Sequence, residues 1–331
     1  MTFHGGGAQH GTMNALLENA AERHPEEAEA AAARLAALLP RGTEVAEILR
    51  LVPGRRAVFA GQWQGVEAVF HLDIAGQEDF AVAHAEQSRV HGYMATGAYR
   101  VPAPLALLAG GRVAVVARIE GVPLLQALWQ AEAEARPAMQ ATGAGWLAAH
   151  AAPTLEDSPV NRGPWRKWAD EGLAQQPHDR LKAVEARVAQ KFHALSRQMR
   201  GQQSWRTALG HGDFHPGNLM RDGAGVTWGI DLGASTRAPL CRDIARFLVH
   251  AARRDMWPSG RRCFGVDAGG LADFASALSL TDQELATDLP FFICHEVLSR
   301  VEHPKMPGRR IRLAQEMTEA LFEDMRDLLR D

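Results

Sequence analysis

Two neighbouring stretches of the chain decide the fold: HGDFHPGNLM at residues 211–220 and WGIDLG at residues 228–233. Leu219–Arg221 and Val226–Ile230 are strand-like runs, and the DGAG link at 222–225 between them is rich in turn residues. We therefore expect an antiparallel β-hairpin, entered from a polar loop.

The hairpin brings two polar side chains together. Paired residue numbers in an antiparallel hairpin sum to a constant, and 218 and 231 are symmetric about the centre of the link, at 224.5. Asn218 and Asp231 should therefore lie close together at the open end of the hairpin. Asp213 precedes Asn218 by five residues, on the loop that enters the hairpin.

These three side chains suit one kind of chemistry. An amide oxygen and a carboxylate are hard oxygen donors of the type that Mg²⁺ prefers, and phosphate groups can complete its coordination shell. The remaining carboxylate can orient a hydroxyl group and accept its proton. The sequence thus indicates that Asn218 and Asp231 hold Mg²⁺ and that Asp213 is a base.

This stretch resembles the aminoglycoside phosphotransferase family, small-molecule kinases with a protein-kinase-like fold. The family loop has the form HGDxxxxN followed by a strand that contains ID, and five residues match it: His211, Asp213, Asn218, Ile230 and Asp231. The Asp-to-Asn spacing and the DLG triplet that begins at Asp231 also equal the protein-kinase pattern. The resemblance extends weakly over residues 45–250, and only the loop is specific.

The resemblance implies ATP- and Mg²⁺-dependent phosphoryl transfer to a hydroxyl group of a small molecule, namely a sugar, an amino sugar or an amino alcohol. We expect His211 to hold the loop by hydrogen bonds. His215 is expected to be structural or to face the substrate, since no third ligand for a zinc site is evident. Asp243 matches a family aspartate that looks structural.

The expected fold class is α+β: a two-lobed, protein-kinase-like fold with a small β-rich N-lobe and a larger, mainly helical C-lobe. We expect an N-terminal helical extension at residues 1–43, the N-lobe at 44–119 and the C-lobe at 120–331, which carries the catalytic loop and the acceptor-binding helices.

Local patterns predict the elements of the N-terminal half. Helices are expected at 12–23, from Pro25 to Leu39, and at about 78–95. Glycine and proline punctuation favours five strands. They are Val45–Val52, Ala57–Trp63, Val66–Asp73, Pro104–Leu108 and Val113–Ile119.

Two N-lobe features bear on nucleotide binding. Backbone N–H groups in the first hairpin turn, together with Arg55, could face phosphates, or the turn could be a plain exposed one. On the helix at 78–95, Glu86 lies between Val82 and Val90 at four-residue spacing, so a buried carboxylate there needs a partner. Glu86 looks like the ion-pairing glutamate of the family, the alternative being a residue at the edge of the apolar stripe.

The segment from Ala117 to Gly121 resembles the family hinge, in which backbone groups near Glu120 and Val122 would pair with adenine. The third strand departs from the family pattern, because His71 stands where a lysine is expected. The chain has lysine only at residues 167, 182, 191 and 305. A histidinium could serve near phosphates and Glu86, or Arg55 could compensate.

The missing lysine supports an alternative: a nucleotide-binding, pseudokinase-like regulator with little or no turnover. The retained Asp213, Asn218 and Asp231 argue against this alternative. Measurement of Mg²⁺-dependent ATP consumption with a set of hydroxylated acceptors discriminates between the two hypotheses.

Composition excludes several other classes. The 331 residues include 36 Lys and Arg against 39 Asp and Glu, a net charge of −3 that argues against a dedicated nucleic-acid binder. Three scattered cysteines form no disulfide framework. We expect no secretion signal, no membrane span and a cytoplasmic location, and the oligomeric state stays open.

Basic residues are concentrated in two C-terminal segments, 253–262 and 300–312. If these segments face the substrate, a neutral or anionic hydroxylated acceptor fits better than a polycationic one. The alternative is a solvated basic surface.

Overall fold

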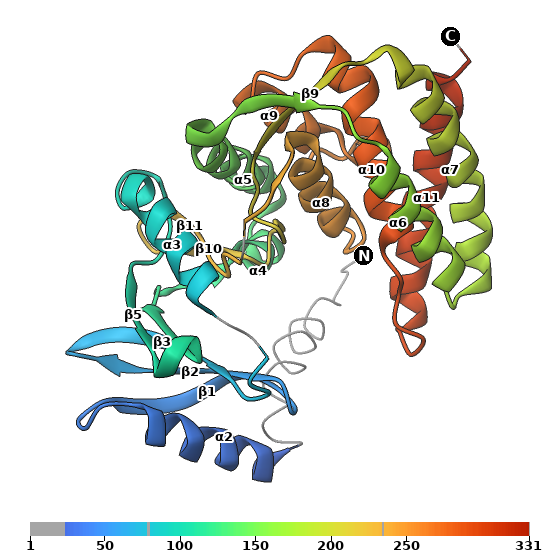
Figure 1. The fold of residues 1–331 in the computed structure, drawn as a ribbon. Coiled ribbons are helices and arrows are strands. Elements are labelled where there is room, and N and C mark those ends of the chain that lie inside the picture. The colour runs from blue at the N-terminus through green and yellow to red at the C-terminus, as the bar shows by residue number, and fades with distance from the viewer. Residues whose placement is uncertain (1–23, 78–79, 234, 331) are drawn as a thin grey trace, which may run out of the picture. The chain divides into compact units, whose positions relative to one another are not determined.

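The computed structural model describes residues 24–77, 80–233 and 235–330, and the helix expected at 12–23 lies outside them. The chain forms two compact units. The first contains the described residues of Met1–Ala95 and Val101–Glu120, and the second contains Thr96–Arg100 and those of Gly121–Asp331. The expected α+β organisation, with a β-sheet region followed by a mainly helical region, is confirmed (Figure 1).

An antiparallel five-stranded sheet forms the first unit, with the order β1-β2-β3-β6-β5. Gln64 and Gly65 both have positive φ, at 51° and 82°, which is the turn that best matches the twist of a two-residue hairpin. The predicted strands are confirmed within two residues at each end. They are Glu44–Val52 (β1), Arg56–Trp63 (β2), Val66–Asp73 (β3), Pro104–Leu108 (β5) and Val113–Ala117 (β6).

Helix α2 (Pro25–Leu38) packs on β1 of this sheet (Figure 1). Its first turn contains proline and two glutamates, which suit the free N–H groups of a helix start. Ala31 and Leu35 are buried in one apolar cluster with Phe59 and Phe70 of the sheet. The helix thus supplies part of the core of the first unit.

Helix α3 (Phe80–Met94) confirms the predicted helix and part of its predicted inward stripe. Val90 is buried and the Glu86 side chain is 10% exposed, as expected, whereas Val82 is 59% exposed. Gln87 is also buried, and its amide donates a 2.5 Å hydrogen bond to the carbonyl of Pro102. A hydrogen-bonded amide can be buried at little cost, so the apolar spacing alone did not identify this residue.

The second unit is mainly helical, and α10 packs against α6, α7 and α8 at its centre (Figure 1). Its fully buried aromatic side chains include Trp146, Phe214 and Phe247. Its helices are Leu124–Gln130 (α4), Arg136–Ala151 (α5), Gly163–Gln175 (α6), Asp179–Gln198 (α7), Leu240–Ala252 (α8), Ala268–Ala277 (α9), Leu289–Ser299 (α10) and Gly308–Leu328 (α11).

Small sheets connect these helices. One sheet has the order β4-β11-β10-β7, another β12-β9-β8, and β13 pairs with β14. The strands are Tyr99–Arg100 (β4), Gly121–Pro123 (β7), Glu156–Pro159 (β8), Ser204–Leu209 (β9), Leu219–Asp222 (β10), Thr227–Gly229 (β11), Arg237–Pro239 (β12), Arg262–Cys263 (β13) and Val266–Asp267 (β14). The β10–β11 hairpin confirms the one predicted and lies between two further strands.

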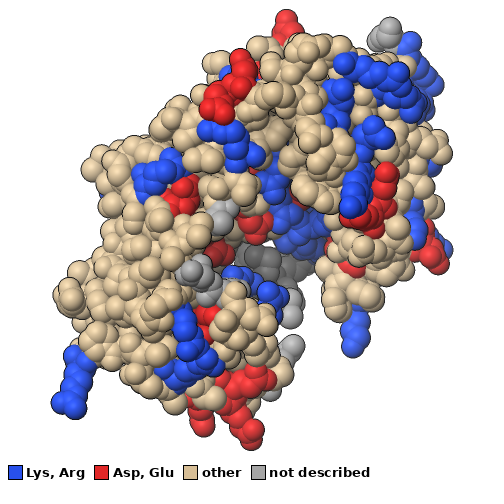
Figure 2. Space-filling view, in the orientation of Figure 1, with Lys and Arg blue, Asp and Glu red and all other residues tan. Residues whose placement is uncertain are grey.

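The molecular surface has mixed charge, as expected from nearly equal numbers of acidic and basic residues. On the face in Figure 2, both signs occur in small groups, and other residues form most of the surface. None of the helices in the described part of the chain has the length and apolar character needed to cross a membrane.

Trp146 of α5 joins the hairpin to the helical core. Its indole is fully buried, and Nε1 donates a 2.9 Å hydrogen bond to the carbonyl of Arg100. The ring passes so close to Gly229 on β11 that a Cβ atom added there would lie 2.0 Å from Trp146 Cζ2. Only glycine leaves room for the indole at this point.

We expect Gly229→Ala to lower the free energy of unfolding by about 2 kcal/mol, because the added methyl group overpacks a rigid aromatic contact. Gly223→Ala in the same hairpin is the matched control, since a Cβ atom there meets nothing within 4 Å, and its effect should stay within about 0.5 kcal/mol. Denaturant unfolding checks both values. Equal stability of the two variants would contradict this account of the hairpin.

Candidate active site

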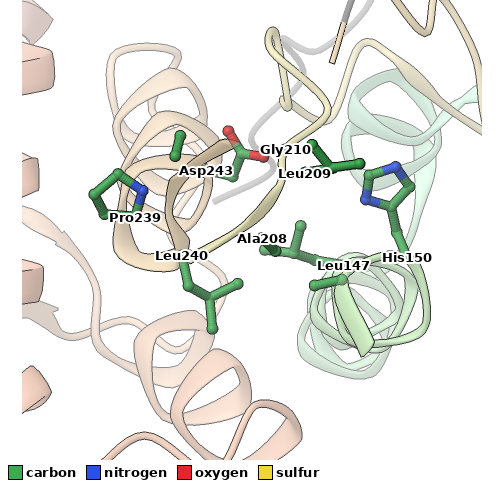
Figure 3. Close-up of a pocket in the computed structure, with 10 residues that line it drawn as sticks. Leu147, His150, Ala208, Leu209, Gly210, Pro239, Leu240 and Asp243 are labelled. Carbon is green, nitrogen blue, oxygen red and sulfur yellow. The ribbon is translucent and has the colours of Figure 1, made fainter. Parts of the chain in front are cut away.

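The loop between β9 and β10 is attached to α8 through its backbone. The N–H group of His211 donates a 2.9 Å hydrogen bond to Oδ2 of Asp243, which lies in the first turn of α8. Figure 3 shows Asp243 beside Gly210, at the edge of a small, mostly apolar cavity of the second unit that Leu147 and Leu240 also line. The Asp243 carboxylate therefore positions the start of the loop, as expected for a structural residue.

His211 ties the same loop to the hairpin. Its ring is buried, and Nε2 lies 3.0 Å from the carbonyl oxygen of Ile230. A carbonyl can only accept, so Nε2 carries the proton in this contact. Burial lowers the pKa of His211 and so favours the neutral ring, while the Asp243 carboxylate has a smaller, opposite effect on this pKa. These contacts hold the loop, as the sequence indicated.

Aromatic side chains of the helical unit pack against the loop between β9 and β10. Phe214 is fully buried and stacks on Trp146 and Phe247, with ring centroids 5.6 Å and 5.2 Å apart. Asp213, directly before Phe214, is exposed. The buried ring and the exposed carboxylate are thus fixed by adjacent residues of one rigid loop.

The hairpin register differs by one residue from the prediction. Leu219 pairs with Gly229, and the N–H group of Ile230 donates to the carbonyl of Asn218 at 2.9 Å. Asn218 therefore lies opposite Ile230, and Asp231 follows one position later with a positive φ of 61°. The cause lies in the turn.

The turn is longer on the β11 side than the residue types indicated. The Asp222 carboxylate accepts hydrogen bonds from the N–H groups of Ala224 and Val226 and from Nε1 of Trp228. These contacts hold Val226 in the turn, so β11 begins at Thr227. The register shifts by one residue, so Asn218 directly precedes β10 and Asp231 lies two residues after the end of β11.

Asn218 has an orientation that suits a cation. Its Nδ2 donates a 3.0 Å hydrogen bond to the backbone carbonyl of Asp213, so Oδ1 remains as an acceptor. In the part of the chain that the structure describes, no three His, Cys, Asp or Glu side chains converge as metal ligands. An amide oxygen and one carboxylate fit Mg²⁺, which commonly takes few protein ligands and keeps water or phosphate in its remaining positions.

Arg246 of α8 binds Asp213, a contact that the sequence analysis missed. Arg246 Nη2 and Nε lie 2.5 Å and 3.0 Å from Oδ1 of Asp213, and Nη1 lies 2.5 Å from Oε1 of Glu296 on α10. A signal was present in the sequence, because Arg246 follows Asp243 by three residues and so shares its helix face.

His215 contacts the other oxygen of Asp213. Its Nδ1 accepts the N–H group of Gly217 at 3.0 Å, and its Nε2 lies 3.5 Å from Asp213 Oδ2. The ring stacks on His250 of α8 with centroids 4.1 Å apart. His215 and Arg246 together lower the pKa of Asp213 well below the usual range of a carboxyl group.

The first unit holds His71, Arg55 and Glu86 at separate positions. His71 lies on β3 between β2 and β6, with its ring edge-on to Phe80 at 6.3 Å. Arg55 is exposed in the β1–β2 turn. Glu86 is mostly buried and forms a 2.6 Å ion pair with Arg89 of its own helix.

The β1–β2 turn directs two backbone N–H groups to partners within the first unit. Gly54 donates to Oε2 of Glu27 on α2 at 3.0 Å, and Arg55 donates to the carbonyl of Val52 at 3.0 Å. Of the two alternatives for this turn, these contacts favour a plain hairpin turn for the backbone.

The remaining expected residues lie where the chain passes from one unit to the other. Glu120 is the last residue of the first unit and is exposed. Val122 lies on β7 and pairs with Arg221 of β10. The same strand pairing therefore links the expected hinge to the hairpin.

We expect Arg246→Gln to raise the pKa of Asp213 toward the ordinary carboxyl range. Loss of the cation removes an interaction that favours the ionised form. A pH titration followed by NMR of the carboxyl carbons measures the change, with Arg312→Gln as an exposed control. An Asp213 titration that is the same in wild type and Arg246→Gln would contradict the ion-pair assignment.

Comparison with solved structures shows the fold. A glucosamine kinase in complex with glucosamine, ADP and inorganic phosphate has a TM-score of 0.56 at 16% identity, covering 88% of this chain and 98% of that one. The aminoglycoside phosphotransferase APH(4)-Ia has a TM-score of 0.54 at 15% identity, covering 85% and 94%. Spectinomycin phosphotransferase APH(9)-Ia, in complex with ADP and spectinomycin, has a TM-score of 0.54 at 11% identity, covering 86% and 93%.

Comparison of the sequence with protein-family models identifies the family of the chain, which the structural similarity alone does not. No curated protein matches the chain. Residues 55–284 match the model of the phosphotransferase enzyme family, a span that includes the loop, the hairpin and α8. Because this match covers more than half of the chain, the protein belongs to the phosphotransferase enzyme family.

Proposed function

We propose that this phosphotransferase moves the terminal phosphoryl group of ATP to a hydroxyl group of a small molecule, in a reaction that requires Mg²⁺. The observation that carries the proposal is the loop that presents Asp213 and Asn218. His211 and Asp243 fix its backbone, and the adjoining hairpin ends at Asp231. This combination of carboxylate, amide and carboxylate is what phosphoryl transfer needs beside the nucleotide.

Asp213 would orient the acceptor hydroxyl and accept its proton as the new oxygen–phosphorus bond forms and the bond to ADP breaks. His215 and Arg246 lower its pKa, so the carboxylate stays ionised throughout the neutral range. A weakly basic carboxylate suits this reaction, because phosphoryl transfer depends mainly on positioning and charge stabilisation. Arg246 would hold the carboxylate in place during the transfer.

Asn218 and Asp231 would hold Mg²⁺, which when bound neutralises part of the phosphate charge. The orientation of Asn218 supports this role, because its amide nitrogen is already used by the Asp213 carbonyl. We assign the contacts with the phosphates of ATP to His71, whose charged form Glu86 would favour, with Arg55 as a further cation. The adenine contacts are assigned to the backbone near Glu120 and Val122.

The structural relatives support a small, hydroxylated acceptor. Their complexes contain hygromycin B, spectinomycin or glucosamine, together with ADP or a nucleotide analogue. For this chain we propose the class they share: a sugar, an amino sugar or an amino alcohol.

We expect Asp213→Asn to reduce transfer about a hundredfold or more while leaving nucleotide binding largely intact, because the amide cannot accept the proton. Asp282→Asn, at an exposed position remote in sequence from the loop, is the control and should keep full activity. Radiolabelled transfer and nucleotide titration measure the two properties separately. Equal transfer rates in wild type and Asp213→Asn would overturn the assignment.

A further inference from the structure

A second polar pocket lies within the second unit, where three helix ends meet. Arg253 and Arg254 come from the end of α8, Arg300 and Glu302 follow α10, and Arg310 lies in the first turn of α11. Met306 completes the lining. Four guanidinium groups thus face one carboxylate.

Arg253 and Glu302 form an ion pair within the pocket. Arg253 is 2% exposed, and its Nη1 donates to Glu302 Oε1 while its Nη2 donates to the Val297 carbonyl at 3.0 Å. The buried Glu185 lies 3.6 Å from the same guanidinium. The carboxylate of the pocket is therefore already engaged, and three arginines remain.

These three arginines have little compensating charge. Arg254 donates from Nη1 to the carbonyl of His250 at 3.0 Å, while its buried Nε has no acceptor in the described part of the chain. Arg300 is 3.5 Å from Oε1 of Glu296, an oxygen that Arg246 binds more closely at 2.5 Å. Among the described residues, none accepts a hydrogen bond from the Arg310 guanidinium.

Burial and the neighbouring positive charges lower the pKa values of these arginines. Burial, followed by the charges of Arg310 and Arg300, lowers the pKa of Arg254 to about 9. Burial is also the main cause that lowers the pKa of Arg300 and of Arg310. Glu302 and Glu296 offset only part of this effect on the pKa values. A cluster of partly buried cations that outnumbers its carboxylates is costly in the free protein, and a bound anion relieves that cost.

The pocket adjoins the proposed catalytic carboxylate. Arg300 contacts Glu296, Glu296 contacts Arg246, and Arg246 contacts Asp213. Arg246 lies within α8, and Arg253 and Arg254 follow directly after the last residue of that helix, Ala252. An acceptor whose hydroxyl lies at Asp213 can therefore place a distal substituent among the arginines.

We propose that this pocket binds an anionic group, a phosphate or a carboxylate, of the acceptor. The inference rests on the proposed function for the identity of the ligand and deepens it by naming the acceptor class: a hydroxylated small molecule that carries a negative charge. Guanidinium groups match both anions through paired N–H donors. The same pocket disfavours a polycationic acceptor.

Binding to the full-length chain without ATP tests the pocket separately from catalysis. The probes are inorganic phosphate, acetate, glucose 6-phosphate, gluconate, glucose and glucosamine, titrated by calorimetry. We expect saturable binding of the anions, with glucose 6-phosphate and gluconate preferred over glucose and glucosamine. The affinities measured for inorganic phosphate and for acetate show whether the pocket prefers a phosphate or a carboxylate group.

Arg310→Gln should weaken binding of the preferred anion about tenfold, because a charge-assisted hydrogen-bond donor is lost. Arg312→Gln, at an exposed position on the same helix, should leave it unchanged, and Arg310→Lys should retain most of it. Thermal unfolding confirms that each variant is folded. Anion binding that is equal in wild type and Arg310→Gln, or a preference for glucosamine, overturns the proposal.

The two proposals fail in different ways. Arginine-dependent anion binding without any ATP consumption would count against the proposed function and support the pocket. Transfer to glucose and glucosamine that exceeds transfer to their anionic counterparts and ignores Arg310→Gln would overturn the pocket and leave the phosphotransferase function intact.

Discussion

His211 forms two hydrogen bonds on which the position of Asp213 depends. Its backbone N–H binds the Asp243 carboxylate, and its ring binds the Ile230 carbonyl. The first contact attaches the loop to α8, and the second attaches it to the hairpin. Because the ring is buried and neutral, breaking either contact would leave a polar group without a partner in the core. These two contacts therefore fix the backbone of the loop at His211, two residues before Asp213.

A continuous series of charged contacts extends from that loop into the helical unit. Arg246 links Asp213 to Glu296, and Glu296 leads to Arg300 and the arginine pocket. The Asp213 carboxylate stays ionised, and the arginines in excess over carboxylates lie at the other end of the series, in the pocket. In our proposal, α8 holds the base through Arg246, and Arg253 and Arg254, which follow this helix, lie in the pocket that binds the acceptor.

Local sequence patterns were sufficient for the five strands of the first unit and for the β10–β11 hairpin, because turn residues and spacing act over short distances. They failed at two points: the Asp222 carboxylate holds Val226 in the turn, so the hairpin register differs by one residue, and on α3 Gln87 is buried while Val82 is exposed. The spacing of Arg246 from Asp243 indicates its helix face but not its partners, and the partners of Arg246 and of the pocket arginines come from segments far apart in sequence. Basic runs alone do not reveal whether their side chains converge.

We propose that the loop supports phosphoryl transfer even though His71 stands where a lysine is expected. The most direct measurement incubates the protein with ATP, Mg²⁺ and a set of neutral, cationic and anionic hydroxylated acceptors, and detects phosphorylated products by mass spectrometry. Our account predicts that ADP and a phosphorylated acceptor form in equal amounts and that both disappear when Mg²⁺ is chelated. Binding of ATP and Mg²⁺ with no phosphorylated acceptor would contradict it and would favour a nucleotide-binding regulator.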